Sequence, residues 1–510
     1  MQPFLFSSQS PSLRAQGAAA REEVSAPGPR LRRLAGALLG ATILALAVPA
    51  AAAPAKPAPV LKLEPYMFKL SDGTQLPAER GTFSVPEERG NPKSRRINIG
   101  FVRLKSTSAT PGNPLVYVAG GPGGSGVASA EGARQAVFLA LRAAGDVIML
   151  DQRGTGFSNH IPSCTAQRRF DPAVTLTDAT LTAYYRETLR YCVGKWTAAG
   201  VAVNGYTTLE NAADIEDLRR ALGAKKIDLW AISYGTQLAM ATMRRYPKSI
   251  GRVVLSSVDG VDQNIKLPAA VDATYKRIEG AMPKPGLIAL MRRVNARFDA
   301  APQSFTFTPK TGPAVTFKTD SFPLRMMAGI LPKDPAGIGQ LFGAYSALDA
   351  GQGAALAPQI YSTFYQNPLT MGGMSQLMDI SSGLSETKAA KVRAQIPGSL
   401  LGDAINFPVS RLIGEVPGVD LGNAYRGAVR SKIPVLVLSG DLDVRTPLEE
   451  QAEAISGLRK RHQIIVRNGG HDLFEAHQDI PKIMIDFFAG RPVAVTELNL
   501  PKPALVPPRQ

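Results

Sequence analysis

The sequence predicts an α/β fold with a mostly parallel central sheet and a long helical insertion. Short apolar runs of strand length alternate with segments of helical periodicity, which is typical of parallel strands buried on both faces. The runs are Leu115–Val118, Val147–Leu150, Ile227–Ile232, Val253–Leu255, Val435–Leu438 and Ile464–Val466. The alternation stops after residue 262 and resumes at Pro434. One α/β domain should therefore be split by the segment between them.

The individual elements follow from their periodicity. Ile97, Ile99 and Phe101 alternate with polar or small residues, which predicts a half-buried strand. Asn211–Leu222 and Tyr234–Tyr246 have helical patterns between the apolar runs. The insertion is mostly helical in pattern. We expect four segments, namely a leader over 1–53, the first part of the core over 54–262, a helical cap over 263–428 and the second part of the core over 429–510.

The leader has the order of a secretory signal. Arg30, Arg32 and Arg33 precede the apolar run Leu34–Val48, and four alanines follow at 50–53. An apolar run of this length is shorter than the roughly 20 residues that span a bilayer. We expect cleavage near Ala52 and a secreted or periplasmic protein without stable membrane association, and a retained anchor is the alternative.

The charge and composition fit a soluble enzyme. The formal net charge is +17, and five Arg and two Glu in residues 1–53 leave +14 for the remainder. The sequence has no block of five like charges and no interleaving of aromatic and basic residues, so we expect no nucleic-acid partner. We expect the excess positive charge to form a basic surface spread over a large protein, which would attract acidic surfaces or substrates only weakly.

The two cysteines, Cys164 and Cys192, lie in one segment. In an oxidising compartment this arrangement favours a disulfide, which would stabilise the fold by about 3 kcal/mol on the chain-entropy model. Two unrelated buried thiols are the alternative. Two cysteines without a nearby histidine pair do not indicate a metal site, and we expect neither metal nor cofactor.

Ser233 is the candidate nucleophile. The run Ile227–Ile232 leads directly into this serine, and a helical pattern begins at the next residue. A serine between strand and helix lies on a tight, strained turn that exposes its hydroxyl, and small residues two positions away let the neighbouring backbone approach. Ala231 and Gly235 occupy those positions. The alternative is an ordinary serine helix cap.

A glycine-rich loop follows the run Leu115–Val118. Gly121, Gly123 and Gly126 match a dinucleotide-binding pattern, and Asp151 lies where a ribose-binding acid would be. Pro122 weighs against that interpretation because it removes a backbone N–H from the loop. The other use of such a loop is an oxyanion hole, in which an N–H of Gly120 or Gly121 joins that of Tyr234.

A serine nucleophile needs a base and an acid that orients it. His471 follows an Asn-Gly-Gly turn after the last buried run and is the candidate base. We expect ordinary settings for the other histidines, with His160 in a loop, His462 at the entry to a strand and His477 on an exposed part of a helix. Asp443, beyond the turn at Gly440, is the candidate acid, and Asp441 is the alternative. The order Ser, Asp, His is the one expected of a nucleophile elbow in a parallel sheet.

Together these motifs resemble the proline iminopeptidase and tripeptidyl aminopeptidase family of serine peptidases, over roughly residues 80–260 and 430–490. The motifs are Gly120–Gly126, Asp151–Ser158, Ser233–Gly235, Gly440–Pro447 and Gly470–His471. The resemblance implies an α/β-hydrolase fold with a helical cap. It also implies hydrolysis of peptides with a free N-terminus, whose amino group cap carboxylates would bind.

Three points stay open from the residues themselves. Glu279, Glu386 and Glu415 lie in the insertion, but none falls in a pattern that identifies an amino-group ligand. A carboxylesterase or lipase would use the same triad, and a non-catalytic binding module would keep the same fold. Arg153 is expected to support the loops and to pair with Asp214.

Overall fold

A computed structural model describes residues 57–504, and their longest strands form one sheet. The ten strands lie in the order β1-β2-β3-β5-β4-β7-β8-β12-β13-β14. Their bounds are β1 Leu61–Lys69, β2 Gln75–Pro86, β3 Arg96–Leu104, β4 Leu115–Val118, β5 Val147–Leu150, β7 Ile227–Ser233, β8 Ile250–Val258, β12 Ser431–Gly440, β13 Leu458–Arg467 and β14 Glu497–Asn499. Two predicted runs coincide with β4 and β5, and the other four lie inside longer strands.

The sheet is mostly parallel, as the sequence predicts. Strands β5, β4, β7, β8, β12, β13 and β14 pair in parallel. Strands β1, β2, β3 and β5 pair antiparallel and form the N-terminal edge. Because parallel strands end at the same side, the residues that follow β4, β7, β12 and β13 lie along one edge. That edge carries every candidate site residue.

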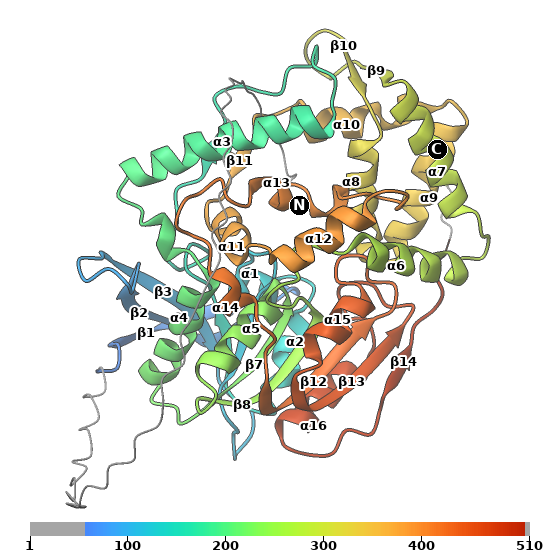
Figure 1. The fold of residues 1–510 in the computed structure, drawn as a ribbon. Coiled ribbons are helices and arrows are strands. Elements are labelled where there is room, and N and C mark those ends of the chain that lie inside the picture. The colour runs from blue at the N-terminus through green and yellow to red at the C-terminus, as the bar shows by residue number, and fades with distance from the viewer. Residues whose placement is uncertain (1–56, 505–510) are drawn as a thin grey trace, which may run out of the picture. The chain divides into compact units, whose positions relative to one another are not determined.

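The helices fall into two groups, as Figure 1 shows. Those around the sheet are α1 Gly126–Glu131, α2 Gln135–Leu141, α4 Thr208–Ala221, α5 Tyr234–Arg245, α15 Leu448–Ile455 and α16 Ile480–Phe488. Those between β8 and β12 are α6 Pro268–Ala281, α7 Leu287–Ala300, α8 Phe322–Ile330, α9 Pro335–Asp349, α10 Ala357–Phe364, α11 Met374–Ser382, α12 Glu386–Gln395, α13 Val409–Leu412 and α14 Gly422–Arg426. This second group, with the short hairpin β9 Gln303–Phe307 and β10 Val315–Thr319, is here called the cap.

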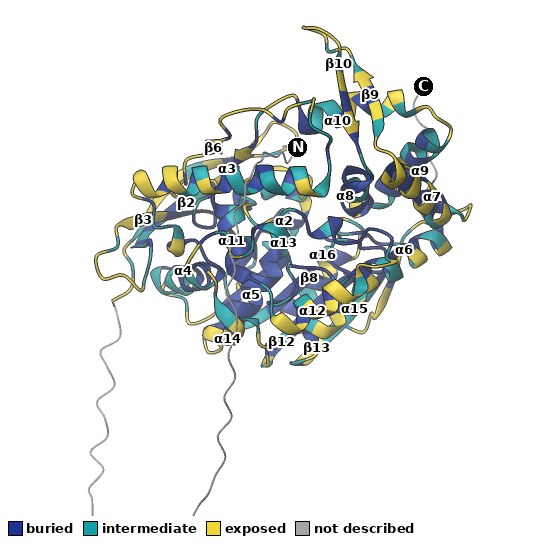
Figure 2. Ribbon diagram, turned by 45° about the horizontal axis from the view of Figure 1, so that its top comes forward, coloured by how far each residue is buried: buried dark blue, intermediate teal, exposed yellow. Residues whose placement is uncertain are grey.

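Apolar side chains fill both faces of the sheet. Val116 and Val118 point into a core that includes α4, α5 and much of the cap, whereas Leu115 and Tyr117 point into a second core with α1, α2 and α16. This alternation is the period of two that a strand imposes. Helix α5 is buried along most of its length, and the β9–β10 hairpin is largely exposed (Figure 2).

A second excursion joins the cap from the first half of the chain. After β5 the chain forms the two-residue strand β6 Cys164–Thr165 and the long helix α3 Asp178–Ala198, which lies among the cap helices (Figure 1). Arg411 of α13 contacts Asp178 of α3 at 2.7 Å. Strand β6 pairs with β11 Thr370–Met371 immediately before α11. The cap is therefore built from two separate stretches of sequence.

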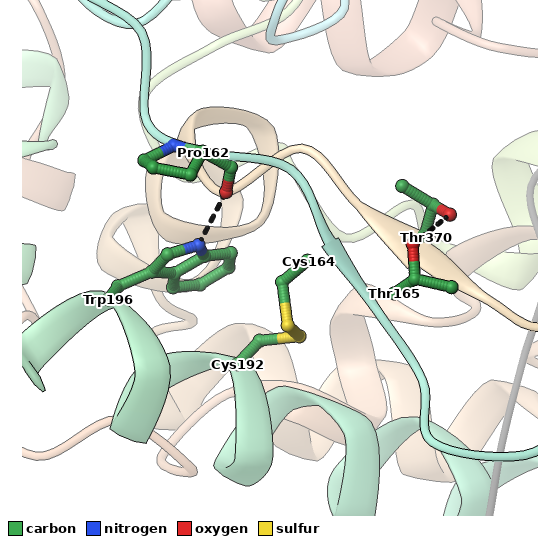
Figure 3. The surroundings of a disulfide bond; sticks show 6 residues. All are labelled: Pro162, Cys164, Thr165, Cys192, Trp196 and Thr370. Atoms are coloured by element: carbon green, nitrogen blue, oxygen red, sulfur yellow. Dashed lines mark hydrogen bonds between the residues drawn. A yellow bond between two sulfur atoms is a disulfide. The ribbon is translucent and has the colours of Figure 1, made fainter. Parts of the chain in front are cut away.

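A disulfide fixes this excursion. Cys164 of β6 is bonded to Cys192 of α3, with 5.6 Å between their Cα atoms, which confirms the pairing expected from the sequence. One turn further along α3, the Trp196 indole donates to the Pro162 carbonyl at 2.8 Å (Figure 3). Across the β6–β11 pair, the hydroxyls of Thr165 and Thr370 lie 3.0 Å apart.

The predicted leader, residues 1–53, lies outside the described residues. Between residues 57 and 504, none of the helices combines the length and the apolarity that a bilayer crossing requires.

Candidate active site

Ser233 occupies a strained turn between β7 and α5. Its φ and ψ are 56° and −133°, a region that a residue other than glycine rarely adopts. Although Ser233 is the N-cap of α5, its side chain caps no backbone N–H, so it is not an ordinary serine cap. A Cβ at Gly235 would lie 2.2 Å from the Val118 carbonyl oxygen, which explains why glycine follows the nucleophile at this position.

The glycine-rich loop after β4 lies against this turn. A Cβ at Gly120 would lie 2.7 Å from the Ile232 carbonyl oxygen and 3.0 Å from the Ser233 Cβ. Gly121 has a φ of 122°, a conformation open to glycine. The N–H of Tyr234 is in the first turn of α5, where backbone N–H groups have no acceptor within the helix. Gly120 therefore lies against the nucleophile turn, Tyr234 directly follows Ser233, and Gly121 lines the same cavity as Ser233.

Asp151 is occupied in a way that leaves no role in ribose binding. It is fully buried, and one carboxylate oxygen accepts from the Ser125 hydroxyl at 2.6 Å and the Val127 N–H at 3.2 Å. The other oxygen accepts from the Phe157 N–H at 2.7 Å. The carboxylate therefore holds the glycine-rich loop to the turn after β5, and the dinucleotide interpretation loses its acid.

His471 and Asp443 are in direct contact. The ring Nδ1 lies 2.9 Å from Asp443 Oδ2 and 3.1 Å from Oδ1. Asp443 is fully buried and also accepts from the Thr446 hydroxyl at 2.5 Å and from the backbone N–H groups of Arg445 and Thr446 at 2.8 and 3.0 Å. Burial alone would raise the pKa of Asp443, but His471 and Thr446 outweigh it and hold that pKa below its ordinary value.

The alternative acid faces elsewhere. Asp441 accepts from the Asn468 N–H at 2.7 Å and lies 3.6 Å from the Arg467 guanidinium. Burial raises the pKa of Asp441. Its contacts tie the ends of β12 and β13 together, and of the two aspartates only Asp443 touches the His471 ring.

The other histidines have ordinary settings. His160 is exposed in a loop, and His462 contacts the Val495 carbonyl oxygen at 2.6 Å from within β13. The expectation that His477 is an exposed helix residue was wrong. It is half-buried in a turn, because α16 begins only at Ile480, where a proline occupies its first turn.

The backbone brings the His471 loop to the strand beside Ser233. Ser257 of β8 donates its hydroxyl to the His471 carbonyl oxygen at 2.5 Å, and the next residue, Val258, is the register partner of Ser233. Within residues 57–504 the Ser233 hydroxyl forms no hydrogen bond to the His471 ring. Unliganded serine hydrolase sites commonly have a long contact here that shortens with substrate.

One cavity joins the nucleophile to the cap. Ser233, Gly121 and Pro122 form its core side. The cap contributes apolar walls, and both sides contribute polar groups. The apolar walls include Met326, Ile330, Ile380, Phe407 and Leu412. The polar groups include Asp259, Asn264, Lys266, Gln376, Asp379, Asn406 and Arg445.

Two aspartates line this cavity, and only Asp259 forms an ion pair with a described residue. Lys266 donates to Asp259 at 2.5 Å. Asp379, on α11, takes part in no ion pair with any lysine or arginine in the described part of the chain. Burial, reinforced by the negative charge of Asp259, raises the pKa of Asp379 to about 8. A cation that enters the cavity would favour the ionised form of this carboxyl group.

The sequence did not single out Asp379, and the insertion glutamates lie elsewhere. Glu279 accepts from two backbone N–H groups at the start of α7, at 2.9 and 3.1 Å. Glu386 is exposed beside Arg393, and Glu415 pairs with two arginines of α3. None of the three lines the cavity of Ser233. The available signal was one acid between two apolar residues of the predicted helical insertion, Met378-Asp379-Ile380.

Arg153 supports the loops as expected. It is fully buried, and its guanidinium contacts Asp214 at 2.7 and 2.8 Å. The same group donates to the carbonyl oxygens of Glu87 and Gly205. Arg89 adds a second contact to Asp214 at 2.6 Å. This network joins β2, the turn after β5 and α4 behind the site.

Comparisons with known proteins agree with this architecture. Residues 113–305 match the family described as alpha/beta hydrolase fold, and residues 421–490 match the family described as TAP-like protein. The tripeptidyl aminopeptidase of Streptomyces coelicolor is 30% identical over 192 residues, which cover 36% of this chain and 35% of that protein. The serine protease Hip1 of Mycobacterium tuberculosis is 27% identical over 192 residues, which cover 36% of each chain.

Each alignment thus spans about a third of the relative's length. Among solved structures, an epoxide hydrolase from an endophytic Streptomyces is 15% identical, covers 86% of this chain and 98% of that one, and has a TM-score of 0.38. The sheet order, the nucleophile turn and the match over residues 113–305 show that the chain has the α/β-hydrolase fold, and residues 421–490 are similar to the TAP-like family.

Proposed function

We propose that the protein is a serine peptidase that hydrolyses peptides near a free N-terminus, with Ser233, His471 and Asp443 as its triad. One observation carries the proposal. The cavity that exposes a strained, uncapped serine also contains an acid, Asp379, that forms no ion pair with any described residue. A peptide with a free amino group supplies both an acyl carbon for the serine and a cation for the acid.

The chemistry follows from the contacts. The Ser233 oxygen attacks the scissile carbonyl carbon while His471 Nε2 accepts the hydroxyl proton. Asp443 holds the proton on Nδ1, which leaves Nε2 free as the base, and stabilises the imidazolium that forms. The N–H groups of Tyr234 and of Gly120 or Gly121 stabilise the oxyanion. His471 then protonates the leaving amine, and water hydrolyses the acyl-enzyme by the same steps in reverse.

Asp379 is the proposed partner of the substrate's amino group. An α-amino group has a pKa of about 7.7–8.0, so near neutral pH it is largely an ammonium ion. Its approach favours the ionised form of Asp379, whose pKa is about 8 in the empty cavity. Within the cavity Lys266 already pairs with Asp259, which leaves Asp379 as the acid available to the ligand.

Export is part of the same proposal. A disulfide forms and persists in oxidising compartments, and Cys164 and Cys192 are bonded. The order of basic, apolar and small residues over 30–53, which resembles a signal peptide, also supports export.

The triad is tested with Ser233→Ala assayed on chromogenic aminoacyl and tripeptidyl amides. Loss of the nucleophile should lower kcat by at least about 10³-fold. The wild-type enzyme should also be labelled by a serine-directed phosphonate, and the variant should not. Activity of the variant within tenfold of wild type would reject the triad. Turnover of simple esters with no turnover of any free-amino peptide would indicate a carboxylesterase instead.

The amino-group site is tested with Asp379→Asn. Removing the carboxylate should raise KM for free-amino substrates and change kcat less, because the interaction binds ground state and transition state alike. Esters without an amino group should be unaffected. Glu386→Gln is the matched control, since Glu386 is an exposed acid of the same cap. Equal KM values for Asp379→Asn and wild type would assign the amino group to another residue.

A further inference from the structure

The backbone of His471 is held from two sides by different parts of the protein. On the core side, Ser257 donates its hydroxyl to the His471 carbonyl oxygen at 2.5 Å. On the cap side, the His471 N–H donates to the Lys333 carbonyl oxygen at 2.6 Å. The peptide groups flanking the proposed general base thus bridge core and cap.

On the cap side, the backbone of Lys333 and Asp334 packs closely against Gly470, the residue before His471. A Cβ added at Gly470 would lie 2.4 Å from the Lys333 carbonyl oxygen and 2.9 Å from the Asp334 Cα. Only a residue without a side chain allows the cap backbone this near to the histidine loop. Gly470 has no positive φ, so the space, and not the backbone conformation, requires glycine here.

The cap segment that makes this contact, Leu331–Asp334, is here called the strap. Its first three residues form a single 3-10 turn between α8 and α9. Asp334 caps α9 by accepting from the Gly337 N–H at 2.9 Å. A Cβ at Gly337 would lie 1.7 Å from the Leu331 carbonyl oxygen, so the strap is packed tightly on the start of α9.

The strap also continues directly from the substrate cavity. Gly329 and Ile330, the last residues of α8, line the cavity that contains Ser233. One short stretch of the cap therefore forms cavity wall at its beginning and holds the His471 backbone at its end. Movement of the cap relative to the core would shift both together.

We propose that the strap is a positioning element for His471, so that the triad reaches its working geometry only when the cap is docked on the core through the Lys333 carbonyl. The inference rests on the proposed function, because it assigns His471 the role of base. Ser257 fixes the peptide group on the other side of His471 from the core and acts as the opposing positioning residue. A displacement of the reacting groups by about 1 Å can cost about 10²-fold in rate.

The test uses Gly470→Ala in the full-length, disulfide-bonded protein. Its methyl group meets the strap backbone and displaces it. We expect kcat for amides and esters to fall by about 10- to 100-fold while KM changes less than about threefold. The acid limb of the kcat/KM profile against pH should also shift, since that limb reports the base in the free enzyme.

Gly457→Ala is the matched control. Its Cβ would lie 2.3 Å from the Val429 carbonyl oxygen, a clash of similar size just before β13, at the opposite end of that strand from the His471 loop. This variant should lose thermal stability and keep the kcat and the pH profile of the wild type. If both variants lose stability equally and keep the wild-type kcat, the contact is structural only and the proposal is wrong.

Asp334→Ala tests the strap in a second way, without introducing a steric clash. It removes the cap of α9 and loosens the strap, and it should lower kcat by about three- to tenfold. Combined with Gly470→Ala, its effect should be less than additive, because both act through one contact. If Ser233→Ala is inactive while both strap variants keep the wild-type kcat, the strap inference is wrong and the proposed function stands. An active Ser233→Ala would overturn the proposed function with it.

Discussion

Replacing Asp443 by asparagine should stop catalysis by reversing the tautomer of His471 while the fold survives. Oδ1 of Asp443 accepts two backbone N–H groups, from Arg445 at 2.8 Å and Thr446 at 3.0 Å. An asparagine must keep its carbonyl oxygen at that position, since an amide NH2 there would face two donors. Its NH2 group would then occupy the position of Oδ2.

That placement determines the outcome at the ring. Oδ2 lies 2.9 Å from His471 Nδ1 and 2.5 Å from the Thr446 hydroxyl. The hydroxyl can rotate and accept from the new NH2 group, so no buried group loses its partner. Because the NH2 group would take the shorter of the two contacts with Nδ1, it favours Nδ1 as an acceptor and moves the ring proton to Nε2, the atom that should take the proton of Ser233. The active-site geometry would be retained, but His471 Nε2 would carry a proton and could not act as the base.

In a serine protease triad, the corresponding change lowers kcat by about 10⁴-fold. A loss of that size is about 5.5 kcal/mol of transition-state stabilisation. The assay is kcat on a tripeptidyl amide, with circular dichroism to verify the fold. Asp441→Asn is the matched control, because Asp441 lies two residues away, is partly buried and contacts Asn468 instead of the ring. Equal losses in the two variants would refute the assignment of Asp443.

Three further outcomes follow from the described contacts. Alanine at both Cys164 and Cys192 should lower the free energy of unfolding by about 3 to 4 kcal/mol and raise KM for free-amino substrates; unchanged denaturant midpoints and KM would contradict this. Arg153→Met should cost about 3 to 5 kcal/mol, because it leaves buried Asp214 short of a partner, whereas the exposed Arg186→Met should cost under about 1 kcal/mol. Asp379 has a folded pKa of about 8, above its unfolded value, so its contribution to stability is present at acid pH and lost as pH rises through 8. Asp379→Asn should therefore raise Tm more at pH 9 than at pH 5, and a pH-independent difference would rule this out.

Local signals were sufficient where one stretch of sequence determines its own structure. The apolar runs at 115–118 and 147–150 coincide with β4 and β5 because strands buried on both faces must be apolar throughout. Ser233 was identifiable because strand, serine and helix are consecutive. Asp443 and Asp441 could be ranked, but only the contact with His471 distinguishes them.

Long-range packing was beyond the same reasoning. Helix α3 buries Leu181, Tyr185 and Leu189, and that pattern predicts a helix without saying which surface it covers. In the structure α3 packs against the cap, and the Asp178–Arg411 contact joins residues that are more than 200 positions apart in the sequence. Asp379 was not identified for a related reason, since one acid in a helix gains significance only when the structure shows that it lines the same cavity as Asp259 and Ser233.

The position of Asp379 depends on two anchors of α11, a helix of nine residues that is too short to be stable alone. At its start, β11 pairs with β6, whose Cys164 is bonded to α3, and Gly373 packs so closely that a Cβ would lie 2.7 Å from the Ile161 side chain. At its middle, the Met378 sulfur accepts from the hydroxyl of Tyr234, the residue after the nucleophile, at 3.0 Å. The disulfide-linked β6–β11 pair and the nucleophile turn thus hold this helix at its start and at its middle, and Asp379 lies next to the second anchor. For this reason loss of the disulfide should weaken binding of the amino group before it affects the triad, whose Asp443–His471 contact belongs to strands β12 and β13.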